Sequence, residues 1–561
     1  MYSAEPLQHF VTHYLAWLHE THPTLATFDG VHAHDDHLDD LSHEAIDESV
    51  RRLNDFGRRL AAINPGSLSA DETLDRPWLE LSIKARTHEL ESIRTWERNP
   101  HHYADLIAAS LASQTLFDHA APTERARRVV SRLKQVPRML QAARANVREP
   151  AGIFVKTAIE TLNGTIRFID VDLPRAFRNV DDLHVLSDLA DATTEASDAL
   201  RRYVQHLQDD VAPQARGSFR LGRARFEEKL KLEEGLAIPA DRLLAIAERE
   251  LEATAEEFRR TAGRINQRSA GGPADPFAAW QKVKDDHPEP GRLVAEVGSQ
   301  LEELRSFLET RDLVTIPDGD RLAVGATPDF YRWTFASLWA PGPFETRASL
   351  AHYYITDADR SWPEDRQKEH MRDFSRALLW AISAHEAWPG HFLHFLHLRT
   401  LASPARKSLM FASTSMVEGW AHYAEHLMME EGFGRDNPSI RLGQLAEALV
   451  RLCRLIVGIR LHTEDLSVEQ GVRMFRERAF LEEPAARREA ERGTFDPGYV
   501  VYALGKLMIL KLRDDVKASS RAFTLKGFHD RLLGGGVLPL GFHRESMLGA
   551  GAASAPSALI E

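Results

Sequence analysis

Apolar residues recur at helical spacing along most of the first 310 residues of the chain. An apolar residue at every third or fourth position is typical of an amphipathic helix that buries one face. The polar faces are rich in Arg and Glu, as solvated helix faces are. Short breaks containing Pro, Gly and Asn separate the segments, and no repeat of fixed period occurs. The pattern predicts a helical N-terminal region, residues 1–310, whose helices include Leu7–Leu18, Ile46–Ile63, Arg76–Trp96, Thr123–Val147 and Leu183–Val211.

The pattern changes after Arg311. Short runs rich in β-branched and aromatic residues, separated by Pro and Gly, predict a small sheet of three or four strands. Helical spacing returns at about Glu364 and continues to Arg513, so residues 311–540 form a second predicted region. Residues 541–561 are rich in Gly, Ala and Ser and are predicted to be a mobile tail. The predicted strands are Leu313–Ile316, Arg321–Val324, Thr334–Trp339 and Ala351–Ile355.

Composition narrows the class of protein. A hydrophobic content of 43% and a charged content of 27% are ordinary for a globular chain of 561 residues. The formal net charge of −13 argues against nucleic acid as the main partner. The single Cys453 excludes an internal disulfide framework and a Cys-rich metal site. The N-terminus does not resemble a signal peptide and no run of apolar residues is long enough to span a membrane, so we expect a cytoplasmic protein with no membrane partner.

The segment from His385 to His391, HEAWPGH, resembles a distorted form of the zinc-hydrolase motif H-E-x-x-H. In the standard motif the two His lie one helical turn apart and the Glu activates a zinc-bound water. Here the second His comes at i+6, which on a regular helix points about 120° away from the first. Pro389 cannot continue the helical hydrogen bonds and Gly390 tolerates unusual backbone angles. We therefore predict a two-residue bulge that brings His391 back beside His385.

A third ligand is offered by the segment EGWAHYAE, which begins at Glu418, 27 residues after His391. That separation allows a helix end, a turn and a second helix packed against the first. Two His and one Glu, with one position left open for water, form a common ligand set for catalytic zinc. Glu425 lies two turns after Glu418 on the same helix face and can orient a ligand His. The alternatives are a pair of hydrogen-bonded structural histidines and an exposed helix charge at Glu425.

Further motifs match a known family and are spread over most of the chain. With HEAWPGH and EGWAHYAE, the chain resembles the bacterial domain-of-unknown-function family 885, whose members are mainly helical and zincin-like. The sequence departs from the family pattern at His394, where a Gln is usual, and at Gly458, where an Asp is expected. The other matching segments are His22–Gly30, Pro341–Glu345, Tyr353–Ile355, Leu461–His462 with Ser467, Glu489 with Arg492, Pro497–Tyr499, Tyr502 and Gly505–Lys506.

The resemblance implies a mainly α, two-lobed, zincin-like body with a small β-sheet beside the metal-binding helix. It implies that His385, His391 and Glu418 bind Zn²⁺ and that Glu386 is the general base. The oxyanion of the reaction needs hydrogen-bond donors. His462, Arg492 and Tyr502 are the candidate donors because they lie in matching segments, and Tyr499 is a weaker candidate; ordinary helix packing or a salt bridge is the alternative for each.

The predicted function is zinc-dependent hydrolysis of amide bonds, with a peptide or small amide as substrate. We expect the strand Ala351–Ile355 to be the sheet edge that pairs with an extended peptide. Two alternatives stay open: hydrolysis of a non-peptide amide or ester, and a metal-binding scaffold without turnover. Glu386 and the absence of a fourth protein ligand argue against the scaffold, because structural zinc is normally closed by four ligands. The chain has neither a phosphate-binding loop nor a G-x-S-x-G nucleophile motif.

Overall fold

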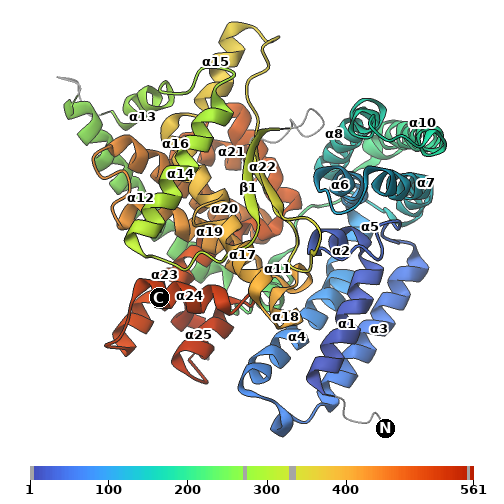
Figure 1. The fold of residues 1–561 in the computed structure, drawn as a ribbon, viewed down its shortest axis with the longest axis horizontal. Coiled ribbons are helices and arrows are strands. Elements are labelled where there is room, and N and C mark those ends of the chain that lie inside the picture. Colours follow the sequence, from blue (N-terminus) through green and yellow to red (C-terminus); the bar gives the residue numbers. More distant parts are fainter. Residues whose placement is uncertain (1–5, 269–274, 328–335, 553–555, 561) are drawn as a thin grey trace. The chain divides into compact units, whose positions relative to one another are not determined.

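Helices make up most of the chain, as the apolar spacing predicts (Figure 1). The computed structural model describes residues 6–268, 275–327, 336–552 and 556–560. The chain divides into two compact units. Unit 1 comprises Met1–Leu221, Pro341–Leu350 and Leu401–Ala412, and unit 2 comprises Gly222–Ala340, Ala351–Thr400 and Ser413–Glu561. The mainly α class with a small sheet is confirmed, whereas the predicted boundary at residue 310 lies inside unit 2.

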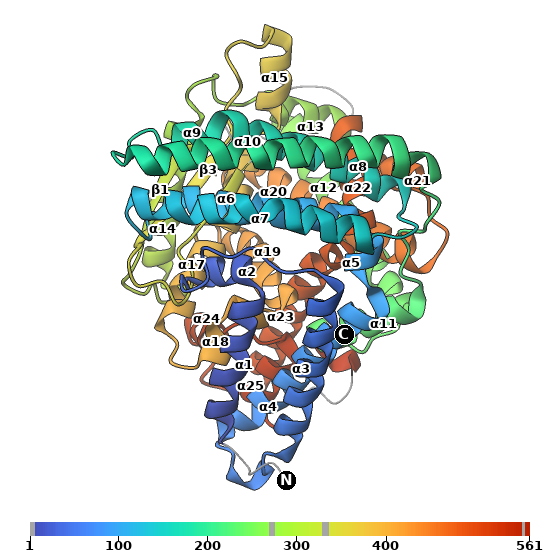
Figure 2. The same cartoon turned by 90° about the vertical axis from the view of Figure 1, so that its right-hand side faces the viewer.

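Unit 1 is built from helices, and its most extensive packing joins helices that are not consecutive in the chain, α7 with α10 and α6 with α8. Figure 2 shows α6, α7 and α10 lying nearly parallel, and α7 contacts both of the others. The two later segments of unit 1 meet at the buried Asp29. Its carboxylate accepts hydrogen bonds from Ser408 (2.6 Å) and the amide of Leu409 (2.8 Å), and its backbone carbonyl accepts from the amide of Phe344 (2.9 Å). The helices are α1 Leu7–Thr21, α2 Pro23–Asp29, α3 His43–Ala62, α4 Ala70–His88, α5 Thr95–Arg98, α6 Pro100–Leu116, α7 Pro122–Asn146, α8 Gly152–Arg167, α9 Leu173–Ala176, α10 Leu183–His206 and α18 Pro404–Lys407.

Unit 2 is organised around the long helix α20. This helix is buried on almost every side and packs against α12, α16 and α21. A helix that is apolar all round belongs in a core, and α20 fits that rule. The helices of unit 2 are α11 Arg223–Glu234, α12 Ala240–Arg268, α13 Pro276–Lys284, α14 Leu293–Arg311, α15 Glu364–Arg372, α16 Arg376–Glu386, α17 His391–Thr400, α19 Thr414–Glu430, α20 Pro438–Thr463, α21 Val468–Ala479, α22 Glu483–Phe495, α23 Val501–Ser519, α24 Leu525–Gly534 and α25 Leu540–Leu548.

The small sheet has three described strands, β1 (Arg321–Ala326), β2 (Ala336–Trp339) and β3 (Leu350–Ile355), in the order β1-β3-β2. β2 and β3 are antiparallel, with Leu338 opposite Tyr353. β3 alternates between half-buried and buried residues and lies in the middle, so the prediction that residues 351–355 form the sheet edge is wrong. β2 is an edge strand instead. The first two residues of its predicted span, 334 and 335, lie outside the described residues.

The predicted strand Leu313–Ile316 is not a strand. Its backbone groups bond to side chains rather than to a neighbouring strand. The amide of Thr315 donates to Asp530 (2.7 Å), and the carbonyl of Leu313 accepts from His529 (2.7 Å). A chain whose hydrogen bonds are used in this way has none left for a sheet, whatever its β propensity.

The C-terminal segment differs from the predicted mobile tail. It overlaps α25, whose Leu540 and His543 are buried, and the described residues Leu559 and Ile560 are only 5% and 7% exposed. α25 packs against α23, because its few apolar side chains find a hydrophobic partner there despite the Gly- and Ala-rich composition. Among the described residues, no helix has both the length and the apolar character that crossing a bilayer requires.

Candidate metal centre

The metal motif lies where one helix ends and the next begins. α16 ends at Glu386 and α17 starts at His391, so the break is four residues long rather than the predicted two-residue bulge. Pro389 has no amide hydrogen with which to continue α16. The carbonyl of Pro389 accepts a hydrogen bond of 2.8 Å from the indole of Trp420, which fixes the turn to α19.

Gly390 allows the two helices to meet closely. A β-carbon added to Gly390 would lie 1.7 Å from the carbonyl oxygen of His385 and 2.5 Å from that of Ala384. No side chain fits there, so the start of α17 can rest directly on the end of α16 only at a glycine. As a result the rings of His385 and His391 lie 4.7 Å apart and perpendicular to one another.

Glu418 from α19 completes a three-residue group. Its Oε2 lies 3.4 Å from Nε2 of His385 and 3.4 Å from Nε2 of His391. Ligands about 2.1 Å from a tetrahedral zinc ion are about 3.4 Å from one another, so these separations fit the ion. Within the described part of the chain, Oε2 of Glu418 is buried and has no hydrogen-bond partner. A buried carboxylate oxygen without a partner is costly, and a cation would satisfy it.

A buried carboxylate orients the first histidine. Nδ1 of His385 lies 2.8 Å from Oε1 of Glu425, which also forms an ion pair of 3.1 Å with Arg451. This bond leaves Nε2 of His385 directed at Glu418, which is the arrangement that metal-binding histidines normally have. Burial disfavours a charged His385, but the carboxylates of Glu418 and Glu425 outweigh burial and raise the pKa of His385 to about 9. The group therefore attracts positive charge.

α19 is held at its N-terminus by a carboxylate from α11. Glu234 accepts hydrogen bonds from the hydroxyl of Ser413 (2.6 Å) and the amide of Ser415 (3.0 Å). Ser413 is the residue that caps α19, and Ser415 lies in the first turn, where amides lack partners within the helix. Burial raises the pKa of Glu234, and these bonds oppose that rise. Glu234 thus fixes the helix that carries Glu418.

Glu386 lies beside the metal group and contacts the sheet. Its Oε2 accepts a hydrogen bond of 3.2 Å from the amide of Leu338 in β2. Glu386 and His385 also line a cavity of about 460 Å³ inside unit 2. That volume is in the range of small-molecule and cofactor sites. The Glu next to the first His therefore faces a space that a substrate can occupy.

Two of the predicted oxyanion donors, Arg492 and Tyr502, line the same cavity. Arg492 donates to the hydroxyl of Tyr502 (3.3 Å) and to Asp496 (3.0 Å). Burial and the nearby charge of Glu418 together raise the pKa of Tyr502 to about 12. Tyr502 therefore stays protonated at neutral pH and can donate a hydrogen bond near the metal group.

A contact between two glycines brings Tyr502 close to Glu418. A β-carbon on Gly419 of α19 would lie 2.5 Å from the α-carbon of Gly505 in α23. Added to Gly505, it would lie 2.0 Å from the carbonyl oxygen of Ser415. The two helices therefore cross backbone to backbone, one residue from Glu418 and one turn from Tyr502.

The other two predicted donors lie elsewhere. His462 is 11 residues after Arg451 on α20, about 16 Å along the helix axis. Its Nε2 lies 2.8 Å from the carbonyl oxygen of Gly493, and its ring stacks on Phe226. Tyr499 is 1% exposed and is not among the residues that line the cavity. The sequence motifs identified His462 and Tyr499 as notable polar residues, and both are buried. They did not show that these two residues lie away from the cavity.

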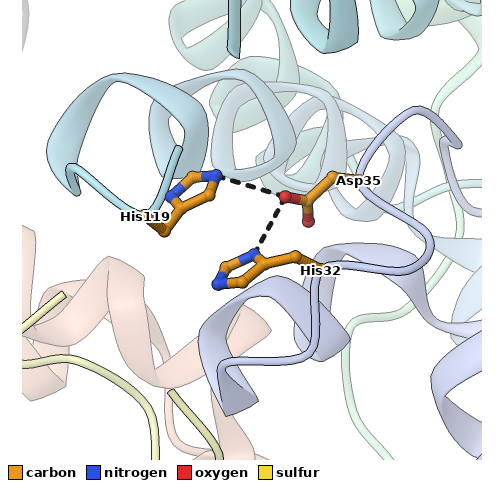
Figure 3. A group of neighbouring side chains, drawn as sticks. All are labelled: His32, Asp35 and His119. Atoms are coloured by element: carbon orange, nitrogen blue, oxygen red, sulfur yellow. Dashed lines mark hydrogen bonds and ion pairs between the residues drawn. The ribbon is translucent and has the colours of Figure 1, made fainter. Parts of the chain in front are cut away.

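A second group of histidine and aspartate side chains occurs in unit 1. Figure 3 shows His32 and His119 both directed at one oxygen of Asp35, at 2.9 and 3.2 Å. The rings are stacked 4.1 Å apart and within 5° of parallel. A metal ion must lie in the plane of each imidazole that binds it, and parallel planes share no point. The same oxygen of Asp35 also accepts from Arg128 at 2.7 Å, so this group does not fit a metal ion.

The second group is instead a clamp on a charged histidine. His32 bonds to Asp35 through Nδ1 and to Glu345 through Nε2 at 2.7 Å. Burial opposes the charge on His32, but the two carboxylates outweigh burial and raise its pKa to about 9. His32 thereby joins the loop after α2 to the segment Pro341–Leu350 of the same unit.

Sequence reasoning missed three contributors to the metal group. Arg451 lies in the apolar helix α20, and nothing in its local pattern distinguishes it from a helix-surface arginine. Trp420 and Gly419 stand beside Glu418 in the motif EGWAHYAE. A tryptophan and a glycine next to a candidate ligand could have indicated that the backbone of another segment packs closely against this helix.

The comparisons with known proteins agree on the fold. The sequence profile of a family described as a bacterial protein of unknown function (DUF885) matches residues 23–547. A putative lipoprotein of unknown function from Shewanella oneidensis has a similar structure, with a TM-score of 0.81 and 23% identity over 97% of this chain and 100% of that one. A putative lipoprotein from Colwellia psychrerythraea gives a TM-score of 0.80 and 18% identity over 96% and 98%. No curated protein matches the chain.

At these identities the two structures show a shared fold and nothing about chemistry. The profile match is different in kind, because it follows the sequence itself over most of its length and includes the metal motif. The chain therefore belongs to the DUF885 family of bacterial proteins of unknown function.

Proposed function

We propose that this protein is a zinc-dependent hydrolase of amide bonds that acts on peptides. The observation that carries the proposal is the convergence of His385, His391 and Glu418 beside Glu386, at the wall of a cavity. Three ligands with an open position are typical of catalytic zinc. A structural site would not need a carboxylate aimed at the open side.

His385, His391 and Glu418 would hold the ion. When bound, zinc supplies Lewis acidity and brings the pKa of a water molecule to about 7. Glu386 then accepts a proton from the attacking water, and the amide of Leu338 keeps its carboxylate in position. Glu425 keeps the Nδ1 proton of His385 in place and leaves Nε2 as the ligand atom.

Tyr502 is the proposed oxyanion donor. Its hydroxyl is protonated at neutral pH, and Arg492 donates to the same oxygen. That bond uses a lone pair of the hydroxyl oxygen, so the hydroxyl hydrogen itself is left to be donated. A donor held in place before the reaction stabilises developing negative charge without reorganisation.

The edge strand β2 supports a peptide as the substrate. The amide of Leu338 donates to Glu386 rather than to β3. Because this pattern alternates along an antiparallel strand, the carbonyl of Leu338 and the backbone groups of Ala336 are the ones that would face a peptide. Ala336 also lines the cavity. An extended peptide can add to such an edge by backbone hydrogen bonds, whereas an isolated ester cannot.

The test is zinc analysis together with digestion of a peptide library. We expect stoichiometric zinc in the purified protein, loss of zinc in His385→Ala, and cleavage of peptides by the wild type. Glu386→Gln should keep the zinc and lose turnover, and Tyr502→Phe should lose about 10²–10³ in kcat, as removal of one oxyanion donor does. Zinc-free protein, or a fully active Glu386→Gln variant, refutes the proposal. Turnover of model esters without peptide cleavage would point to the non-peptide alternative.

The cytoplasmic location remains a prediction from the sequence. Both similar structures are described as putative lipoproteins, and attachment to a membrane through a lipid is the alternative location to test for this chain. Fractionation of cells that express this chain would decide between the two locations.

A further inference from the structure

The cavity extends well away from the metal group. Its floor is one face of α16, marked by Leu378, Ile382 and His385 at helical spacing. Leu378 precedes Glu386 by eight residues, which is about 12 Å along the helix axis. Phe374, which lies just before the start of α16, lines the cavity as well. The space is therefore an elongated channel with the metal group near one end.

The middle of the channel is lined by ion pairs. Arg454 holds Glu489 with two hydrogen bonds of 2.6 and 2.8 Å, and Arg451 pairs with Glu447. Side chains that neutralise one another in a fixed geometry give little preference for a charged ligand. Selection among peptides therefore falls to the far end of the channel.

The far end is aromatic and preformed. Trp280 and Phe480 line it together with Leu481 and Phe374. Behind them, Phe258 stacks on Phe480 at 4.8 Å and meets the edge of Trp280 at 6.1 Å. Lys284, at the same end, is held by Glu482. Three rings packed on one another form a rigid apolar wall that needs no rearrangement to receive a ligand.

The backbone of Phe480 gives an independent indication. Its φ is +57° at the position that ends α21, where glycine is the usual residue. A bulky side chain is disfavoured at positive φ. Such conformations persist where the surroundings hold them and are concentrated at ligand-binding sites. Here the conformation belongs to a residue that lines the channel and stacks on the aromatic wall.

We infer that the far end of the channel is a specificity subsite for a bulky apolar side chain of the peptide. The subsite lies about 12–18 Å from Glu386, and an extended peptide advances about 3.3–3.6 Å per residue. The selected side chain therefore stands about three to five residues from the bond that is cleaved. This inference rests on the proposed function for the position of that bond, but the subsite itself can be tested without turnover.

The experiment uses nine-residue Ala/Ser peptides that carry one Phe at successive positions, with the all-Ala/Ser peptide as reference. Binding is measured by calorimetry on the zinc-loaded Glu386→Gln variant, and cleavage is mapped with the wild type. We expect Phe peptides to bind roughly 10- to 100-fold tighter than the reference, as burial of one large apolar side chain provides. We also expect the cleaved bond to move with the Phe at a constant spacing.

Variants of the wall identify the subsite. Trp280→Ala and Ala485→Phe, introduced into the binding variant, should each remove the preference for Phe, the first by opening the wall and the second by filling the space. Trp380→Ala is the matched control, because Trp380 lies on α16 but packs on Phe433 and does not line the cavity. The Trp380→Ala variant should keep the preference for Phe peptides. Circular dichroism shows which variants are folded. If Trp280→Ala does not fold, Ala485→Phe still tests the subsite.

The outcomes separate the two proposals. Equal binding of Phe and reference peptides, or a preference that both wall variants retain, overturns the subsite. Cleavage at bonds unrelated to the Phe overturns it too, and leaves the proposed hydrolase standing. If the wall variants abolish the preference for Phe in the binding test while the wild type cleaves no peptide, the subsite is supported and the hydrolase is refuted.

Discussion

Gly390→Ala should separate the two histidines of the metal group. The added β-carbon would lie 1.7 Å from the carbonyl oxygen of His385, and real contacts of this kind are essentially never shorter than 3.0 Å. The start of α17 must therefore move by about 1.3 Å, the difference between the two values. Distances from ligands to a metal ion vary by only about ±0.2 Å. If His391 moves with the start of α17 by that distance, it can no longer reach the metal ion together with His385 and Glu418.

The expected loss of zinc affinity exceeds the roughly 10- to 100-fold that removal of an outer partner of a ligand costs. Overpacking at such a position also costs about 1–3 kcal/mol of stability. Affinity is measured by competition with a chromophoric chelator, and stability by urea denaturation followed by circular dichroism. Both measurements use the full chain.

Gly298→Ala is the matched control. Gly298 lies in α14 of the same unit, and a β-carbon there meets nothing within 4 Å. The change should leave zinc affinity unaltered and raise stability by up to about 1 kcal/mol, because alanine is the better helix former. A Gly390→Ala protein that binds zinc as tightly as the wild type would refute the reasoning about the helix junction.

Three further predictions concern carboxylates and histidines of the two units. Glu425→Gln should weaken zinc binding roughly 10- to 100-fold in the chelator assay, whereas Glu430→Gln on the same helix should not; equal affinities would remove Glu425 from the support of His385. Glu234→Ala should lower stability by about 1–3 kcal/mol in urea, because it leaves the buried first turn of α19 without its acceptor; an unchanged midpoint would contradict this. The contribution of His32, whose pKa is raised to about 9, is fully present below its unfolded pKa of about 6.5 and is lost as the pH rises through 9. The free energies of unfolding of wild type and His32→Gln, measured with urea, should therefore differ by on the order of 2 kcal/mol at pH 6 and converge above pH 9; a difference independent of pH would refute this prediction.

Local chemistry made the convergence of His385, His391 and Glu418 predictable. Pro389 and Gly390 are residues whose effects on a helix are known in advance, so a break between His385 and His391 could be expected from the sequence. The spacing to Glu418 allowed a second helix to return, and the position of Glu425 on the same face followed from helical periodicity. Each of these steps depends only on residues close in sequence, or on the packing of one pair of helices.

The remainder depends on which helices meet, and the sequence pattern does not contain that. Periodicity shows that α20 is buried but not that Arg451 faces Glu425 while His462 lies three turns away. β propensity identified β2 and β3 but could not say which one is the edge, because that depends on strand order. Unit 1 also takes in two later segments of the chain, which no local pattern indicates.

The crossing of α19 and α23 at Gly419 and Gly505 has a consequence for how the family can vary. Where two helices touch through side chains, a change on one can be absorbed by a new rotamer on the other. Here backbone touches backbone, so no side chain can adjust, and the distance between the two helices is fixed. Because Glu418 and Tyr502 lie on either side of this crossing, the same contact fixes the spacing between the candidate ligand and the hydroxyl. A larger residue at either glycine, here or in a homologue, should therefore displace Glu418 and Tyr502 relative to one another.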